Sequence, residues 1–482
     1  MSWTKNDKFK NYILIILVIT SVVQVGVLWY YQNGGMPTNF LWGVFNSPKK
    51  QVTIDTGDYI KPYRIRVTEG FENPHWVINE NDKHYDSLWY DAKYYIGNIL
   101  SNKNILAERE FSEEKWEEVI VRKSTVFEFK SNLNSNLMAA FLRVKFYSDF
   151  KPSGIYKIAV LPSENINNNA NIYIYDGIRV YMYTMHFNKE GLSRSDYDVV
   201  ISQLYESESD SFEVVKEIFP TSSRSRYNFK PDVLVVAKGN KYRGFRNIIA
   251  GIPYDLGNIS PDSIDINLIS EEVLGSEKDS FIRSIDAHSA IVFKNFSNTY
   301  RISRDGMLEY RYLSVLDRNE KGNEIEAFQK AIEFIKKREN LVSGADIYLA
   351  GMVEQANFYT FYFDYKINDM SVFVNKYPVV GSNTSVNHGI TINANSKRVV
   401  NCQWVLRKFE VGQETLDLNV NFGDLLDDTF ALYSNLINGN FSIKDKSVSY
   451  EISYTLNTQS IKPVWVIETI DNTRYIVPMR ER

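Results

Sequence analysis

The sequence predicts an α+β protein with a single N-terminal transmembrane helix plus a multi-domain extracytoplasmic region of mixed antiparallel sheets and helices. Three observations lead to this fold class. A long uncharged apolar run near the N-terminus has the length of a membrane span. The rest of the chain mixes segments of helical periodicity with segments that alternate apolar and polar residues. Two Asp-Gly pairs stand between alternating segments, which indicates tight β-hairpins.

Residues 12–31 form the predicted transmembrane helix. From Ile13 to Tyr31 no residue is charged, and at 1.5 Å per residue this run reaches roughly 30 Å, the thickness of a bilayer's hydrocarbon core. Three lysines precede the run and three aromatic residues close it: Lys5, Lys8, Lys10, Trp29, Tyr30 and Tyr31. The positive-inside rule places the N-terminus in the cytoplasm. We therefore expect a single-pass protein of the cell membrane whose C-terminal region is extracytoplasmic.

A cleaved signal peptide is the alternative to a retained anchor. The apolar region of a signal peptide usually has about 7–15 residues, and small residues follow it at the cleavage site. Here the run is longer, and it ends in Trp29, Tyr30 and Tyr31, which are bulky. The single cysteine, Cys402, lies far from the span, so it cannot carry a lipid there. These features favour an uncleaved anchor.

The chain has 482 residues, which is longer than a single domain with one hydrophobic core usually is. The Asn-rich stretch 164–170 and the polar stretch 318–323 suggest boundaries between domains. We expect six parts: a cytoplasmic tail (1–11), the transmembrane helix (12–31), a tether (32–50), an N-terminal α+β domain (51–165), a middle α+β domain (166–318) and a C-terminal α+β domain (319–482).

Each expected domain contains predicted strands and helices. In the first, strands are predicted at 62–67, 75–78, 125–129 and 155–161, and helices at 82–100, 113–121 and 136–144. In the second, hairpins are predicted at 172–185, with Asp176-Gly177 at the turn, and at 299–312, with Asp305-Gly306; a helix is predicted at 195–205 and a strand at 233–236.

The C-terminal domain contains the clearest helix, Glu324 to Arg338, whose apolar residues fall on one face. Strands are predicted after it at 358–365, 370–375, 389–393 and 398–406. A second helix at 424–437 is followed by strands at 450–456, 464–470 and 475–477. This order indicates a possible duplicated helix-plus-meander unit.

The sequence contains no H-E-x-x-H, no G-x-S-x-G and no phosphate-binding glycine loop. The histidines are scattered: His75, His84, His186, His288 and His388. A metal pair formed by His75 and His84 is less plausible than solvated or hydrogen-bonded side chains. Cys402 lies in an apolar strand pattern, where cysteine usually behaves as a small buried hydrophobe rather than a nucleophile.

Two charged clusters have ordinary structural explanations. The acidic cluster is more typical of a solvated loop than of a cation site; its members are Glu206, Glu208, Asp210, Glu213 and Glu217. The basic run Lys336, Lys337 and Arg338 ends a helix, where cations complement the dipole. The net charge of −4 offers no basic field for nucleic acid. We therefore expect no enzyme activity, no catalytic residues, no metal and no cofactor, which is typical of an interaction or sensing protein.

The chain resembles the YycH family. The resemblance rests on the lysine-bearing N-terminus, the span ending in WYY, the Tyr/Asn-rich exterior and the hairpin TYRISRDGMLEYRY. The region from about 320 resembles the related YycI-type domain, with the strands DMSVFVN, GITIN and RVVNCQW. The resemblance implies an accessory regulator of the WalK (YycG) sensor histidine kinase, which controls cell-wall metabolism. It also implies a membrane complex with that kinase and a YycI-like sister regulator, and it implies no catalytic residues.

Three polar residues could form a partner-binding face on the span: Thr20, Ser21 and Gln24. They are three or four positions apart, so they share one side of a helix, and lipid offers them no hydrogen-bond partner. A neighbouring helix can supply one; alternatively Thr20 and Ser21 bond back to their own helix. Two functions stay open: a regulator that binds a membrane kinase, and an extracytoplasmic cell-wall enzyme or ligand-binding or inhibitor protein.

Overall fold

The computed structural model describes the greater part of the chain after residue 58. The described residues are 17, 20, 21, 24, 59–162, 169–187, 192–207, 210–215, 227–230, 232–237, 245–254, 264–314, 320–379, 381–435, 441–471 and 473–481. Most of the tail, the span and the tether expected at 1–50 therefore lies outside them. Within the described part, no helix has the length and hydropathy to cross a membrane.

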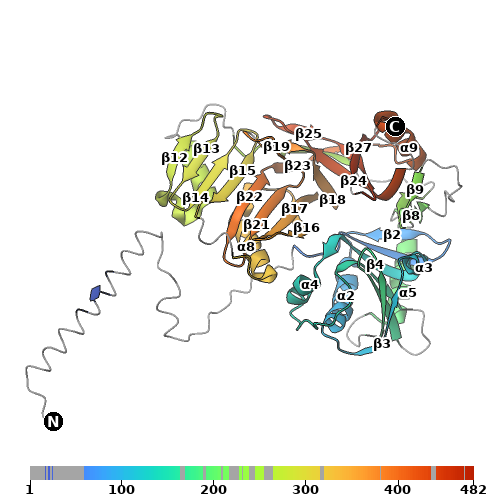
Figure 1. Cartoon of the computed structure of the whole chain (residues 1–482). Coiled ribbons are helices and arrows are strands. Elements are labelled where there is room, and N and C mark those ends of the chain that lie inside the picture. Colours follow the sequence, from blue (N-terminus) through green and yellow to red (C-terminus); the bar gives the residue numbers. More distant parts are fainter. Residues whose placement is uncertain are drawn as a thin grey trace, which may run out of the picture.

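The described chain is organised around two large sheets, each with helices packed on it (Figure 1). The first sheet is antiparallel, and the second is antiparallel except for the parallel pairs that β24 forms with β18 and β9. We call residues 59–215 and 232–237 the N-terminal lobe, and residues 227–230 and 245–481 the C-terminal lobe. Helices and largely antiparallel strands occur in both lobes, so the predicted α+β class is confirmed.

The N-terminal lobe contains a nine-stranded sheet in the part of the chain that the structure describes. Its spatial order is β10 (Leu234–Val236), β8 (Ser211–Val214), β2 (His75–Ile78), β1 (Arg64–Gly70), β4 (Arg122–Leu133), β5 (Ile155–Leu161), β6 (Asn169–Tyr175), β7 (Val180–His186) and β3 (Ile105–Phe111). The predicted hairpin around Asp176-Gly177 joins β6 to β7. Gly177 has φ +97°, a conformation that glycine adopts without steric cost.

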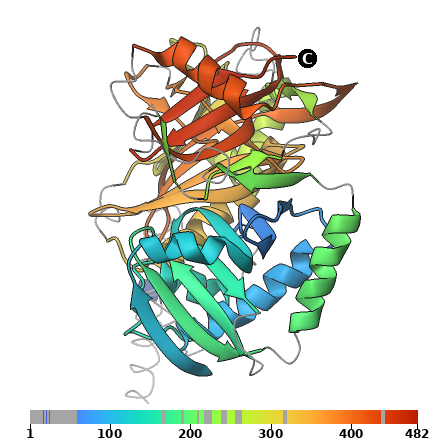
Figure 2. The same ribbon diagram turned by 90° about the vertical axis from the view of Figure 1, so that its right-hand side faces the viewer.

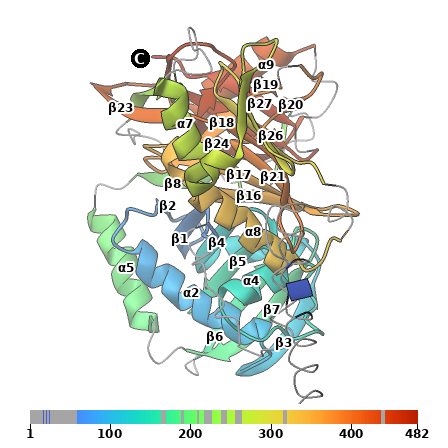
Figure 3. The ribbon, with the colours of Figure 1, turned by 90° about the vertical axis from the view of Figure 1, so that its left-hand side faces the viewer.

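Helices cover the two faces of this sheet differently. Figure 3 shows α2 (Tyr85–Leu100), α4 (Ser135–Phe141) and α5 (Arg194–Glu206) on one face. There Leu88 and Trp89 of α2 pack with Phe127 of β4 in the main core. Figure 2 shows the opposite side, where α3 (Glu114–Ile120) covers only one end. The rest of that face is free to meet the C-terminal lobe.

The C-terminal lobe contains a sheet of 13 strands among the described residues. Eleven follow one another as β12 (Ile282–Ile285), β13 (Ile291–Lys294), β14 (Asn298–Ile302), β15 (Met307–Tyr312), β22 (Val399–Val405), β21 (Ile390–Ala394), β17 (Tyr359–Ile367), β18 (Met370–Val374), β24 (Phe441–Ile452), β26 (Pro463–Thr469) and β27 (Arg474–Pro478). In addition, β16 (Asp346–Glu354) pairs with β17, and β9 (Tyr227–Phe229) pairs with β24.

Smaller elements complete the C-terminal lobe. Helix α8 (Glu324–Lys336) packs Phe328 against Phe361 and Phe363 of β17, and its N-terminus is capped by Asn323. The other elements are α7 (Ile264–Leu274), α9 (Phe422–Tyr433), the 3₁₀ turns Gly275–Ser280 and Glu339–Leu341, the three-stranded sheet β23 (Lys408–Thr415), β11 (Arg246–Gly251) and β25 (Gln459–Ile461), and the pair β19 (Tyr377–Pro378) and β20 (Ser385–Val386).

The strand and helix predictions agree with the structure at most positions, but the sheets run across the expected domain boundaries. The boundary expected at 165/166 falls between β5 and β6, which are paired neighbours in one sheet. The boundary expected at 318/319 separates β15 from β22, which are also paired. The two helix-plus-strand stretches of 319–482 join one sheet through the parallel pair β18 and β24. The strand predicted at 450–456 is wrong in its position: β24 ends at Ile452 and begins at Phe441.

Candidate functional site: the junction of the two lobes

One face of the nine-stranded sheet carries a row of charged residues towards the C-terminal lobe. Strand periodicity places Arg64 and Arg66 of β1 on the same side, and register puts Glu128 of β4 opposite Arg64. The Nε of Arg64 donates to Glu128 over 2.5 Å, and its second guanidinium nitrogen donates to Asp445 of β24 over 3.3 Å. Asp445 belongs to the C-terminal lobe. This arginine therefore connects the two sheets.

A second buried pair extends the row. Lys157 of β5 donates to Asp232, which lies two residues before β10, and it lies 3.9 Å from Glu128. Burial by itself raises the pKa of Asp232, but Lys157 and then Arg66 outweigh it and hold this pKa below its ordinary value. Asp232 is therefore ionised, and the pair is a charged one in a buried position.

Arg66 is fully buried and lies close to these carboxylates. None of its three guanidinium nitrogens has a hydrogen-bond partner among the described residues. Burial lowers its pKa, while Glu128 and Asp232 oppose that effect. Buried charges are tolerated only when opposite charges surround them, and removal of one partner then costs several kcal/mol. The row thus balances three cations against three carboxylates, and one of those carboxylates comes from the other lobe.

Two cavities lie on either side of this row. The larger has a volume of about 790 Å³ and is lined from both lobes, by Lys130, Tyr156 and Lys157 on one side and by Lys444, Glu468 and Arg474 on the other, among others. Here Lys444 pairs with Glu468 over 3.0 Å. Cavities of this size accommodate small molecules.

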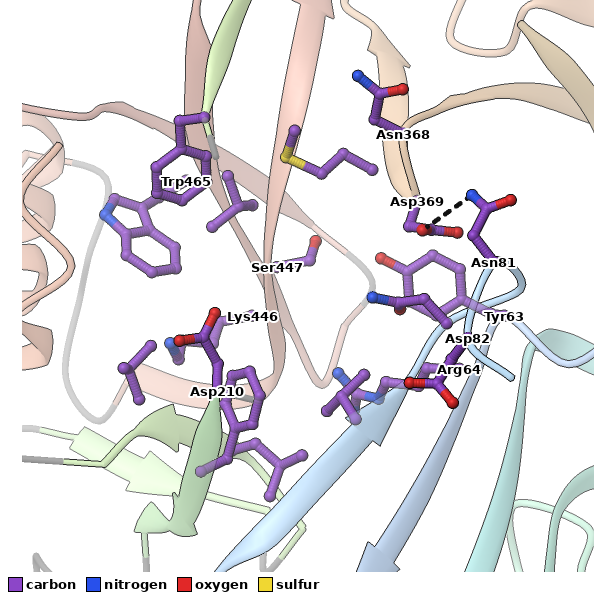
Figure 4. A pocket seen from close by; sticks show the side chains of 18 residues that line it. Tyr63, Arg64, Asn81, Asp82, Asp210, Asn368, Asp369, Lys446, Ser447 and Trp465 are labelled. Atoms are coloured by element: carbon purple, nitrogen blue, oxygen red, sulfur yellow. Dashed lines mark hydrogen bonds between the residues drawn. The ribbon is translucent and has the colours of Figure 1, made fainter. Parts of the chain in front are cut away.

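The smaller cavity has a volume of about 450 Å³ and is also lined from both lobes. Figure 4 shows Tyr63, Arg64, Asn81 and Asp82 on one side of it and Lys446, Ser447 and Trp465 on the other. Across its rim, the side-chain amide of Asn81 donates to Asp369 over 3.2 Å. Burial, and secondarily Arg64, lowers the pKa of Lys446 to about 7, although Asp445 raises it. The side-chain amine of Lys446 therefore titrates near neutral pH.

The candidate histidines lie in separate places. His75 is buried in β2, neither ring nitrogen has a described hydrogen-bond partner, and burial, followed by Arg66, lowers its pKa to about 3. His84 precedes α2, and burial lowers its pKa as well. His388 contacts the carboxylate of Asp364 at 3.1 Å. His186 ends β7, and His288 lies between β12 and β13. No group of three or more His, Cys, Asp or Glu suited to a metal ion occurs in the described part of the chain.

Cys402 is buried in β22, as its sequence context predicts, and burial raises the pKa of its thiol. The thiol is therefore protonated and shielded from solvent, both of which disfavour nucleophilic chemistry.

The acidic cluster and the basic run predicted from the sequence lie in different parts of the structure. Of the acidic cluster, Asp210 lines the smaller cavity, Glu206 ends α5 and Glu213 lies in β8, whereas Glu208 and Glu217 are outside the described residues. Of the basic run, Lys336 ends α8, Lys337 is its C-cap residue, and Arg338 donates to the carbonyl of Phe334 over 3.1 Å and to Tyr300 over 2.7 Å. The expected position of this run at a helix end is confirmed.

Thr20, Ser21 and Gln24 are described as helical and exposed. Their role in partner binding stays a prediction.

Sequence reasoning missed the charged row and Lys446. The pattern that could have revealed Lys446 is a charged residue on the apolar face of a strand. Lys446 shares its side of β24 with Val448, Tyr450 and Ile452, all of which are buried. Arg66 does not follow this pattern, because the buried residues Ile65 and Val67 point to the opposite face of β1, and the residues beside Arg66 on its own face are Arg64 and Thr68.

Comparison with known proteins gives a likeness in fold. No family model matches the chain, and no curated protein matches it. The crystal structure of YycH from Bacillus subtilis superimposes with a TM-score of 0.54 at 11% identity, over 87% of this chain and 96% of that chain. A protein from Eubacterium rectale superimposes with a TM-score of 0.29 at 13% identity, over 54% of this chain and 88% of that chain, which is too low to support an argument. The chain therefore has a YycH-like fold.

Proposed function

We propose that this chain is a membrane-anchored extracytoplasmic regulator of a sensor histidine kinase of the WalK (YycG) type, which controls cell-wall metabolism. The observation that carries the proposal is the likeness to YycH over 87% of the chain, which agrees with the family resemblance of the sequence. The regulator acts through contacts between proteins and not through catalysis.

The proposed partners are the kinase and a YycI-like sister regulator. The YycI-like character of residues 319–482 belongs to this proposal. The predicted span at 12–31 brings the chain next to the partners' own helices. Thr20, Ser21 and Gln24 then form the docking face, because interhelical hydrogen bonds in membranes contribute about 0.6–2 kcal/mol each.

Co-purification from membranes tests the proposal. An affinity-tagged full-length chain, expressed with the kinase and extracted in mild detergent, should retain the kinase on the resin. Gln24→Leu should weaken this retention because it removes the largest polar group of the docking face. Val23→Leu is the matched control, since one residue turns a helix by about 100° and moves the change off that face. Absence of the kinase from the wild-type eluate contradicts the proposal, whereas equal retention by both variants contradicts only the docking face.

A ligand-binding protein is the second candidate, and the cavities favour it. The cavities of about 790 Å³ and 450 Å³ both lie between the lobes, where a bound molecule would contact both sheets. Ligand binding and kinase regulation are compatible, since a regulator can sense a molecule through the same junction.

A further inference from the structure

Among the residues that the structure describes, none pairs with the side-chain amine of Lys446, which lies at the wall of the smaller cavity. Lys446 is 7% exposed and lines the cavity wall. Its ammonium group makes no hydrogen bond or ion pair with any residue that the structure describes. It lies over the ring of Trp465, 4.3 Å from the centroid, and 5.4 Å from that of Phe422. A lysine amine in a largely buried position normally has an anion or a hydrogen-bond acceptor beside it. A ligand in the cavity can supply that acceptor to Lys446.

The rest of the wall combines flat aromatic rings with the side-chain amides and carboxylates of Asn and Asp residues. The rings belong to Tyr63, Phe212, Phe245 and Trp465, and the polar side chains are Asn79, Asn81, Asp82, Asp210, Asn368 and Asp369. Amides both donate and accept hydrogen bonds, and carboxylates accept them. A sugar matches this set, because each hydroxyl donates and accepts while the carbon-bound hydrogens of the ring form a flat apolar face.

The charges of the wall limit the anion to a single negative charge. Arg64 is already paired with Glu128 and Asp445, so Lys446 is the cation that can meet an incoming anion. Three carboxylates also face the cavity, and they would repel a second negative charge: Asp82, Asp210 and Asp369. A carboxylate therefore fits better than a phosphate, which carries up to two charges at neutral pH.

We propose that this cavity binds an acidic sugar whose carboxylate pairs with the amine of Lys446, whose ring lies against Trp465 and whose hydroxyls bond to the Asn and Asp side chains. The ligand contacts strands of both lobes, because the wall comes from β1, β8 and β10 as well as from β24 and β26. This inference goes beyond kinase regulation and stands without it.

The site predicts that ligand binding is accompanied by proton uptake. The pKa of Lys446 is lowered to about 7, firstly by burial and secondly by Arg64, while Asp445 opposes the shift. At pH 8 most of the free protein therefore holds a neutral amine. A bound carboxylate favours the charged ammonium, so the site takes up a proton as the ligand binds. The other titratable groups of the wall are Tyr63, Arg64, Asp82, Asp210 and Asp369.

Two matched pairs of sugars test the proposal. N-acetylmuramate and N-acetylglucosamine share a ring and differ in one carboxylate-bearing group. Glucuronate and glucose also share a ring, and only glucuronate carries a carboxylate. Isothermal titration calorimetry uses the purified full-length protein in detergent. We expect at least one acid to bind about tenfold or more tightly than its neutral counterpart, which is the size of one charge-assisted hydrogen bond. Titrations at pH 8 in buffers of different ionisation enthalpy should show uptake approaching one proton per ligand.

Two lysine variants of β24 locate the site. Lys446→Met keeps the length of the buried side chain but removes its amine, so it should lose the preference for the acid and the proton uptake. Lys444→Met is the control, because Lys444 is paired with Glu468 and lines the larger cavity. Equal affinity for the acid and neutral sugars, no binding of either acid at millimolar concentration, or unchanged preference in folded Lys446→Met overturns the proposal. Should Lys446→Met fail to fold, absence of proton uptake by the wild-type protein overturns it.

Discussion

The buried pair of Lys157 and Asp232 gives a quantitative prediction. Asp232→Asn removes the negative charge and leaves Lys157, which is 9% exposed in its side chain, without its direct partner. Loss of one member of a buried pair costs about 3–5 kcal/mol of unfolding free energy. Lys157 keeps Glu128 at 3.9 Å, which places the expected loss near the lower limit, about 3 kcal/mol. For a domain of roughly 150–250 residues this corresponds to a fall in Tm of about 6–12 °C.

Thermal unfolding followed by near-ultraviolet circular dichroism and by calorimetry measures this loss. Lys462→Met is the matched control, since Lys462 and Glu481 form an ion pair in which both side chains are 59% exposed. Exposed pairs contribute about 0–1 kcal/mol, so the control should change Tm by no more than a few degrees. A fall in Tm for Asp232→Asn no larger than that of the control would refute the reasoning.

The pH dependence of the same variant follows from the lowered pKa of Asp232. Because the folded pKa lies below the unfolded value of about 3.9, the stabilisation is fully present above about pH 4. It is lost as the pH falls from there through the folded pKa. The difference between the wild-type protein and Asp232→Asn should therefore be constant from pH 5 to 7 and shrink in more acidic solution.

Three further outcomes are expected. Lys446→Met should stabilise the protein by about 1–4 kcal/mol at pH 6, because it removes a buried charge. The gain should shrink as the pH rises from about 7 towards 10.4, since the folded lysine is then neutral and the cost of releasing the proton held in the unfolded state falls with pH. Thermal unfolding across this range checks the sign of the change. Cys402 should react with a thiol reagent only after denaturation, and fast reaction of the native protein would contradict its burial. A fragment of residues 319–482 should aggregate in size-exclusion chromatography because β22 loses its pairing with β15.

The sequence predicts best those elements whose apolar residues repeat regularly. Helix α8 has a continuous buried face, and the hairpins around Gly177 and Gly306 have a glycine at a positive φ, so local sequence alone specifies them. Strands with irregular or polar patterns were missed. In β16 a register shift between Leu349 and Gly351 interrupts the alternation, and β3 and β23 lie at sheet edges with many exposed charged or polar residues.

The candidate site was beyond prediction for a different reason. Arg64 and Asp445 are 381 positions apart, and only the packing of the lobes brings them together. The positions of the domain boundaries were hard to predict for the same reason, since an Asn-rich loop can separate two domains or connect two neighbouring strands of one sheet. Burial also converts Lys446 from an ordinary surface charge into a group that titrates near neutral pH, and no local pattern specifies how deeply a strand will be covered.

The path of the chain between the lobes determines what a single cut can do. The backbone runs from β8 in the N-terminal lobe to β9 in the C-terminal lobe, returns to β10 and then continues to β11. A protease that cleaves once between β8 and β9 leaves β10 on the second fragment, although β10 is paired with β8 of the first fragment. The two pieces are thus interlocked. Nicked protein should migrate as two bands in denaturing gels and as one species under native conditions, so the loss of covalent continuity need not end its activity.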